Sequence, residues 1–398
     1  MSLLNRRRVL LAKLESAYGT DATPGNANAI LALQSGFVLN PLEGSEVSRD
    51  FVRPYFGSAG KIRVENFASL EFEVELAGSG TAGSIPAVSP LLRACGLSET
   101  IVGSAITGTA QTGTGTTVVL AASASGIGNF YSGMMVSITS GTGSGQTRTI
   151  SGYDAVSKTA TVSMPWTGDH PISGSGYSIA ANVSYLPVSL NQESCTLYFN
   201  LDGVRHILIG CMGTMSLALN VKQIPALKFK MTGLLGTITD QTLPQADYSG
   251  FKAPLAVSTA NTVGFLLHGN SAANLQSLSC DIGNTVIHRM LVGSESVMIT
   301  NRVAVGNVAI EASPVSSNAL HTEMTPYDWW SAAKNKVRGP LSVQHGTAAG
   351  NTVTITSPSV EVGTPKYQDM DGIAMLALAL DFVPNQTTGN DELKLTFQ

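Results

Sequence analysis

The sequence predicts a mainly β fold with many turns, and composition, alternation and turn spacing all indicate it. Only 13% of the 398 residues are charged and 41 are Gly. Val, Thr, Ser and Ala take the place of the Lys, Glu and Leu that are typical of helical proteins. Leu70–Leu76 alternates strictly between apolar and acidic residues, which is the two-residue period of a strand with one apolar and one polar face. The length allows two or three domains.

A second alternating stretch offers a partner for this acidic strand. Three Glu on one face of Leu70–Leu76 repel one another unless something relieves the repulsion. Ala226–Met231 has the same alternation, with two Lys in place of Glu. We expect the two strands to pair, with apolar residues on one face and a Glu/Lys ladder on the other. Each cross-strand pair would contribute about 0.2–1 kcal/mol.

Charge and hydropathy exclude several classes of protein. A net charge of −4 is unlike that of a protein that grips nucleic acid, which would be basic. The Arg residues of Met1–Arg8 are not followed by the apolar run of a signal peptide. Even Ala374–Val383 is about half the ~20 residues that a transmembrane helix needs. The four Cys have no metal-site spacing and are expected to be small buried residues in a reducing cytoplasm.

The first 66 residues are expected to contain an arm and a functional loop. Gly19, Pro24 and Gly25 break the periodicity of residues 1–34, so this segment reads as an arm that wraps a neighbour or stays loose. A short strand then ends at Leu39–Gly44. Residues 45–66 form a long loop, and long loops in compact proteins tend to be functional.

The segment Gly78–Gly83 matches G-x-G-x-x-G and is the feature closest to an enzyme motif. It follows a strand and precedes a short predicted helix, Pro86–Cys95, which Gly96 closes. However, the helix starts late, and the preceding strand is amphipathic, whereas the strand of a dinucleotide site is buried on both faces. A flexible Gly/Ser loop is therefore the favoured interpretation.

Residues 103–182 change in character and predict a small β domain inserted into a loop of the main fold. Gly, Ser and Thr dominate, and Trp166 is the expected core residue. Short strands at regular spacing are typical of a small sandwich or barrel. The expected strands are Thr116–Ala121, Met134–Thr139, Gln146–Ser151 and Lys158–Ser163.

From Val183 the earlier pattern resumes and is then repeated. Each repeat is expected to hold a hairpin, two long amphipathic strands and one short helix. The first hairpin joins Cys195–Leu201 to Val204–Gly210 through Asp-Gly, Met215–Asn220 is a further strand, and 236–250 is a linker. In the second repeat the hairpin joins Leu275–Ile282 to Val286–Val292, a helix capped by Thr325 runs from Pro326 to Val337, and strand 307–313 pairs with 373–383.

The expected organisation is therefore an N-terminal arm, two similar units and one insert. The arm is 1–34, the first unit is 35–102 with 183–250, the insert is 103–182, and the second unit is 251–398. No H-E-x-x-H, C-x-x-C or P-loop lysine occurs, and the six His are isolated, so we expect no enzyme activity and no catalytic, cofactor or metal residues. Trp329 and Trp330 could form a binding hot spot, or pack their helix on its sheet or on a neighbouring subunit.

Several stretches resemble the major tail tube proteins of long-tailed, non-contractile bacteriophages. The resemblance covers most of 1–250 except 103–182, and the remainder more loosely. The matching stretches are Leu10–Asp21, Pro41–Gly44, Val52–Tyr55, Glu73–Gly83, Pro90–Gly96, Thr196–Gly203 and Ile224–Phe229. The G-x-G-x-x-G then belongs to the family's loop after a tube strand.

This resemblance implies two tail-tube-type β-sandwich or barrel domains and a structural virion protein. Subunits would form rings, and stacked rings would close their amphipathic strands into a β-barrel channel for DNA. Two domains per chain favour a trimer with pseudo-sixfold symmetry, although a hexamer remains possible. The tape measure protein and other tail proteins would be partners, double-stranded DNA would pass without specific binding, and assembly would take place in the host cytoplasm.

The resemblance also suggests which residues face the lumen and which lie between subunits. An acidic wall would repel phosphate and let DNA slide, and the insert would decorate the outside of the tube. The lumen-facing residues are expected to be Glu71, Glu73, Glu75, Lys228, Lys230 and Asp381. The residues expected between subunits are Arg49, Arg53, Tyr55, Trp329 and Trp330.

Two other functions remain open from the sequence. The first is another tail or virion protein, such as a terminator, fibre or head decoration protein, which ring stacking would exclude. The second is a nucleotide-binding enzyme, which rests on Gly78–Gly83 alone. A saturating nucleotide should then stabilise the fold by about 2.7 kcal/mol at 100 times its dissociation constant.

Overall fold

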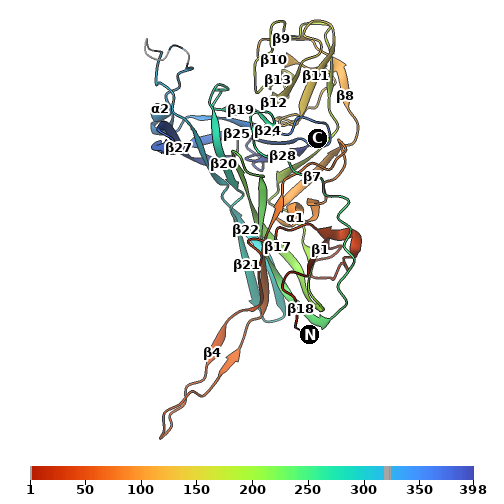
Figure 1. Cartoon of the computed structure of the whole chain (residues 1–398), viewed down its shortest axis with the longest axis vertical. Coiled ribbons are helices and arrows are strands. Elements are labelled where there is room, and N and C mark those ends of the chain that lie inside the picture. The colour runs from red at the N-terminus through yellow and green to blue at the C-terminus, as the bar shows by residue number, and fades with distance from the viewer. Residues whose placement is uncertain (1, 318–321, 323) are drawn as a thin grey trace.

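The computed structural model describes residues 2–317, 322 and 324–398 and is mainly β, as the sequence predicts. Figure 1 shows an elongated molecule with a long sheet through its middle. A separate small β domain lies at one end, and the thin hairpin that contains β4 projects from the other. No helix among the described residues is long and apolar enough to cross a membrane.

The main sheet is antiparallel throughout and gathers strands from the whole chain. Its strands are β1 (Arg8–Leu14), β2 (Ala29–Ile30), β3 (Val38–Glu43), β6 (Phe67–Glu75), β7 (Leu97–Val102), β15 (Asn182–Pro187), β16 (Cys195–Leu201), β17 (Val204–Asn220), β18 (Ala226–Asp240), β19 (Thr262–Leu267), β20 (Leu275–Asp281), β23 (Val305–Glu311), β24 (Arg338–His345), β25 (Val353–Val362), β26 (Lys366–Met370), β27 (Ile373–Phe382) and β28 (Lys394–Phe397).

The remaining elements are two separate hairpins, the inserted sheet and short helices. The hairpins are β4 (Glu46–Ser48) with β5 (Lys61–Arg63), and β21 (Asn284–Leu291) with β22 (Ser294–Arg302). The inserted sheet holds β8 (Ile106–Thr109), β9 (Thr112–Thr114), β10 (Thr117–Val119), β11 (Met135–Ser140), β12 (Thr147–Asp154), β13 (Thr159–Val162) and β14 (Gly176–Ile179). The helices are α1 (Ser89–Ala94), α2 (Trp329–Lys334) and a 3-10 turn (Asn26–Asn28).

The two long-range strand pairings expected from the sequence are confirmed. β6 pairs with β18 so that Lys228 lies opposite Glu73 and Lys230 opposite Glu71. β23 pairs with β27 over its full length. The hairpin of β16 and β17 also forms as expected, turning at Asp202-Gly203, where both residues have positive φ.

Several expectations were wrong in detail. β20 does not form a hairpin with β21, because it pairs with β17 and β23 while β21 pairs with β22. β17 is one continuous bulged strand, and β18 runs on into the expected linker as far as Asp240. The segment expected to be an arm that wraps a neighbour or stays loose contributes β1, which pairs with β16 over seven residues of this same chain.

Both helices form but are shorter than expected. α1 starts at Ser89, and the residues from Pro86 form a turn in which Ser89 N–H donates to the Pro86 carbonyl at 2.9 Å. α2 starts at Trp329, because the Asp328 carboxylate accepts a hydrogen bond from Ser331 N–H at 2.9 Å. Asp328, rather than Thr325, is therefore the N-cap.

Residues 106–179 form a sheet with a hydrophobic core of its own. The four strands expected in this segment are present as β10 to β13, and Trp166 is buried in that core. Contacts with the main sheet come largely from the C-terminal strand. Gln398 bonds to Gly133 and Met135 at 2.8 and 2.9 Å, and the Lys394 Nζ donates to the Phe130 carbonyl at 2.7 Å.

Burial at this junction gives the stability of the chain a distinctive pH dependence. Burial lowers the pKa of Lys394 from 10.5 to about 7, because a buried ammonium loses its hydration. Between these two values the unfolded chain binds a proton that the folded chain does not. The free energy of unfolding should therefore rise with pH over this range.

We expect Lys394→Met to remove this rise. Between pH 8 and 10 the natural chain should gain about 2–3 kcal/mol more than the variant, since one proton contributes about 1.4 kcal/mol per pH unit. Urea unfolding at several pH values measures the difference. The matched control is Lys13→Met, at the exposed position of the otherwise buried β1, which should keep the rise. Parallel curves for Lys394→Met and the natural chain would contradict the assignment.

Candidate functional site

The six residues expected to face a lumen lie on the polar face of one continuous run of eight strands. In spatial order these are β3, β6, β18, β17, β20, β23, β27 and β26. Residues directly opposite on neighbouring strands share a face, so the register assigns each side chain to one face. The β17–β20 pairing joins the strands before residue 250 to those after it.

The two faces of this run differ completely in chemistry. A row on one face is apolar and buried from end to end, and its members are Val74, Leu227, Leu217, Cys280, Gly306 and Leu380. The next row, on the other face, is mostly polar, and its members are Glu73, Lys228, Ser216, Asp281, Val305 and Asp381. The apolar face packs into the main core. On the polar-face side, the hairpin of β21 and β22 covers the end that holds Phe67, Met212 and Leu234, and the rows from Glu71 onward are bare in the single chain.

The expected Glu/Lys ladder is present, but both lysines converge on one carboxylate. Lys228 and Lys230 lie 3.8 and 3.4 Å from the Glu71 oxygens. Glu73 and Glu75 have no ion pair among the described residues. Because both ammonium groups are largely exposed, each pair contributes at most about 1 kcal/mol.

The polar face as a whole is acidic. Its carboxylates outnumber its lysines, Lys228, Lys230 and Lys366, by seven to three, and they are Glu43, Glu71, Glu73, Glu75, Asp281, Glu311 and Asp381. Small or uncharged positions between them include Ser216, Ala218, Ser279, Asn307 and Ala379. The ionised side chains of this face thus sum to a net charge of −4 per chain.

Sequence reasoning missed about half of this face. Asp281 and Ser279 belong to Leu275–Asp281, where small polar residues alternate with Leu278 and Cys280. The same period of two that marked the acidic strand was present there. It was obscured because Ser and Ala contrast less with their apolar neighbours than Glu does.

The residues expected between subunits divide into exposed and buried ones. Arg49, Arg53 and Tyr55 lie in the hairpin of β4 and β5 that projects from the body (Figure 1). Beside them Val52 and Phe56 are fully exposed, and the Arg53 guanidinium lies 5.3 Å from the Phe51 ring and 5.7 Å from the Tyr55 ring. The hairpin thus presents bare apolar and cationic side chains.

The two tryptophans lie at different depths. Trp329 is fully buried in the core of its own chain, 4.2 Å from the Tyr327 ring, and so is not part of the surface. Trp330 is half-buried and lies 5.6 Å from the exposed Tyr367 ring on β26.

The glycine-rich loop has a structural explanation. A Cβ on Gly78 would lie 2.2 Å from the Gly350 carbonyl oxygen, and Gly80 N–H donates to that same oxygen at 2.7 Å. Gly80 also has a φ of +85°, which favours glycine. The preceding strand, β6, belongs to an antiparallel sheet and is buried on one face only, unlike the strand of a dinucleotide site. Within the described part of the chain, no group of three His, Cys, Asp or Glu could hold a metal ion.

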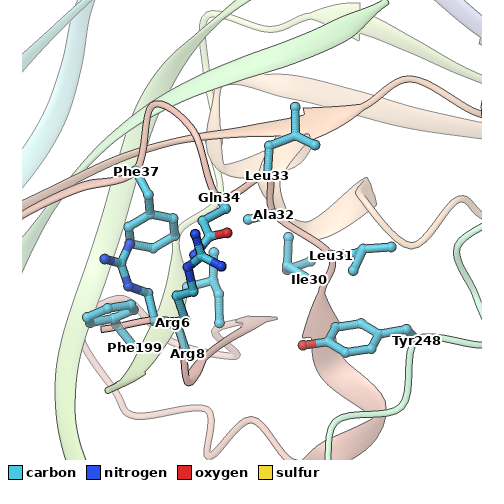
Figure 2. Close-up of a pocket in the computed structure, with 11 residues that line it drawn as sticks. Arg6, Arg8, Ile30, Leu31, Ala32, Leu33, Gln34, Phe37, Phe199 and Tyr248 are labelled. Carbon is cyan, nitrogen blue, oxygen red and sulfur yellow. The ribbon is translucent and has the colours of Figure 1, made fainter. Parts of the chain in front are cut away.

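A pocket behind β3 carries two arginines that the sequence did not single out. Figure 2 shows Arg6 and Arg8 close to Phe37 and Phe199 on one side of it, with Tyr248 on the other. The Arg8 guanidinium lies 5.5 Å from the Phe37 ring. Arg6 and Arg8 have no ion-pair partner within residues 2–317, 322 and 324–398.

Comparison with known families gives one match, which covers almost the whole chain. The model of a family described as phage tail tube protein matches residues 5–383. No curated protein gives a significant match. The matched range includes all eight strands of the polar-faced run, the inserted sheet and the projecting hairpin. This chain is therefore a member of the phage tail tube protein family.

Proposed function

We propose that three copies of this chain form a ring, and that stacked rings form the tail tube of a long-tailed, non-contractile phage. The polar face lines the channel through which double-stranded DNA passes into the host. The observation that carries this proposal is the continuous run of eight strands whose apolar face is covered by the core and whose polar face is bare beyond the end covered by the hairpin of β21 and β22. The tape measure protein and other tail proteins are its partners, and assembly takes place in the host cytoplasm.

The number of strands supports three copies. Barrels of eight strands are filled by their own side chains, whereas those of 16–18 strands leave an aqueous channel. With strands about 4.8 Å apart and tilted by about 40°, 24 strands give a backbone radius of about 24 Å. That radius leaves a channel wider than a DNA duplex. Six copies would double the radius, far beyond what a DNA duplex requires.

The run also supports two similar units per chain. β3, β6, β18 and β17 come from 35–102 and 183–250, and β20, β23, β27 and β26 come from 251–398. Each unit thus supplies four neighbouring strands to the wall, which gives a trimer its pseudo-sixfold symmetry. The insert, 103–182, contacts β24 and β28 through Thr149 and Phe130, so it would decorate the outside of the tube.

The charge of the wall explains how DNA passes without sticking. Three copies with a net charge of −4 each would present −12 per ring to the DNA phosphates. A basic wall would instead release counterions and bind DNA strongly at low salt. The Lys residues beside Glu71 reduce repulsion between strands while leaving the sign of the wall negative.

Imaging tests the ring directly. We expect end-on averages of purified tubes to show an open channel and three outer projections, one per inserted domain. Six projections would mean one tube unit per chain and would contradict the two-unit organisation. Filaments without a channel would contradict the tube itself.

Removing the net negative charge of the wall tests the lumen. Glu73→Lys with Glu75→Lys adds +4 per chain and changes the wall of a trimer from −12 to 0. The wall then no longer repels DNA and has a cluster of cations around Lys228, so we expect DNA to bind it, and DNA delivery and infectivity to fall at least tenfold and recover partly at high salt. The matched control is Asp169→Lys, an exposed position of the insert, which should leave both unchanged. Normal infectivity of the double variant would show that this face does not line the channel.

A further inference from the structure

We propose that the free edge of β26 pairs with the free edge of β3 in the next copy of the ring. In the same contact, Asp369 and Asp371 of one copy meet Arg6 and Arg8 of the next. This inference rests on the proposed ring and identifies which edges close it, in which register, and by which ion pairs.

Both edges are open in the single chain. β3 pairs with β6 on one side only, and β26 pairs with β27 on one side only, among the described residues. Nearly every residue of β26 and most of β3 are exposed. Unpaired N–H and C=O groups along such edges are ready to pair with another strand.

Strand direction permits the pairing. Every neighbouring pair in the run is antiparallel, so directions alternate across its eight strands. An even number means that β3 and β26 run in opposite directions. Rotating a copy about the ring axis therefore brings β26 beside β3 as one more antiparallel pair, and the alternation continues round the ring.

The register of the two edges gives an independent check. Following paired residues from Asn40, at the middle of β3, across β6 and β18 leads to Met212 on β17. Following paired residues from Asp381, on β27, across β23 and β20 leads to Ser216 on β17. Ser216 lies four residues beyond Met212. Gln368, at the middle of β26, lies opposite Met375, which is six residues from Asp381 along β27 in the same direction. The two edges are thus offset by ten residues along the strands.

An offset of ten residues is what a closed barrel requires. Ten residues rise about 33 Å, and eight strands span about 38 Å, so pairing the two edges at their middles tilts the strands by about 41°. Barrel strands tilt by roughly 35–45°. A shift of one residue would turn every lumen side chain outward.

The pairing brings chemically matched residues together. With Asn40 opposite Gln368, Val38 lies opposite Met370, and both are apolar. All of these positions belong to the polar-face side of their strands, so the wall continues across the junction.

On the other side of the same strands, two charges meet their opposites. In this register Asp369 of one copy lies opposite Leu39 of the next. Asp371, in the turn after β26, lies opposite Phe37. Phe37 lies against the Arg8 guanidinium in the pocket of Figure 2. Asp369 and Asp371 are exposed and have no ion pair within the described parts of the chain. The turn thus supplies carboxylates to a pocket whose two guanidinium groups have no ion pair among the residues that the structure describes.

Disulfide cross-linking in purified phage particles tests the register. Val38→Cys with Met370→Cys places thiols on directly opposite residues, whose Cα atoms are then about 4.5–5.5 Å apart, within the range of a disulfide. Oxidation should give covalent dimers and trimers and no larger species. The natural cysteines are all buried, so they add no background. The matched control, Val38→Cys with Lys366→Cys, separates the thiols by about 13 Å along the strands and should not cross-link.

The outcomes separate this pairing from the ring itself. Rings seen by microscopy without cross-links would overturn the pairing and leave the ring intact. A ladder that extends to six copies would support the pairing and overturn the trimer. Cross-linking of the control pair instead would overturn the register.

Charge reversal provides a second test that needs no cysteine. Arg6→Glu and Asp371→Lys each change an exposed side chain, so the variants should keep the melting temperature of the free chain. We expect each alone to reduce the yield of tubes at least tenfold and the two together to restore most of it. Equal losses in the double variant and in the single variants, with unchanged melting temperatures, would overturn the ion pairing.

Discussion

Val74, Leu227, Leu217 and Cys280 lie in one buried row across four strands, and burial of this row and its neighbours is the interaction on which the structure depends. Apolar surface contributes about 25 cal/mol per Å² removed from water. Since a strand alternates its side chains, burying one face leaves every second residue on the other. The outer strands and α1 and α2 cover the apolar face, which is why the polar face can be continuous and, beyond the end covered by the hairpin of β21 and β22, bare.

A strand of this sheet could be predicted from the sequence where its neighbouring residues differ strongly in polarity. Glu71–Glu75 and the Lys strand alternate strongly, so their pairing across about 150 residues of chain could be predicted. Leu275–Asp281 alternates weakly, and Gly283-Asn284 looks like a hairpin turn. Its true partners, β17 and β23, are set by packing in the whole sheet, which no local pattern encodes. The same reason explains why the pattern of residues 1–34 predicts an arm, although β1 pairs with β16 of the same chain.

The polar face was predicted better than the contacts around it. Charged residues on a strand are visible in a sequence, and five of the six lumen candidates lie in the β6–β18 pair. The pocket of Arg6 and Arg8 joins residues from the first forty positions to Phe199 and Tyr248, and a pocket of this kind exists only after folding. Trp329 could not be assigned from the sequence, because an aromatic residue at the start of a helix is compatible with both a core and a surface position. The structure places it in the core, in contact with Tyr327.

The open edges of β3 and β26 are a risk for the free chain but are needed in the proposed ring, and both strands have features that reduce the risk. An exposed edge strand invites indiscriminate pairing, yet a ring requires one edge to pair with another. β3 is only six residues long, is interrupted by a bulge and contains Pro41, while β26 is only five residues long and carries Lys366 and Asp369. Short, irregular and charged edges pair weakly with arbitrary strands. In the proposed ring they would gain enough for a stable contact only when the partner also pairs with Arg6 and Arg8, so the ion pairs would restrict ring closure to copies of this chain in one register.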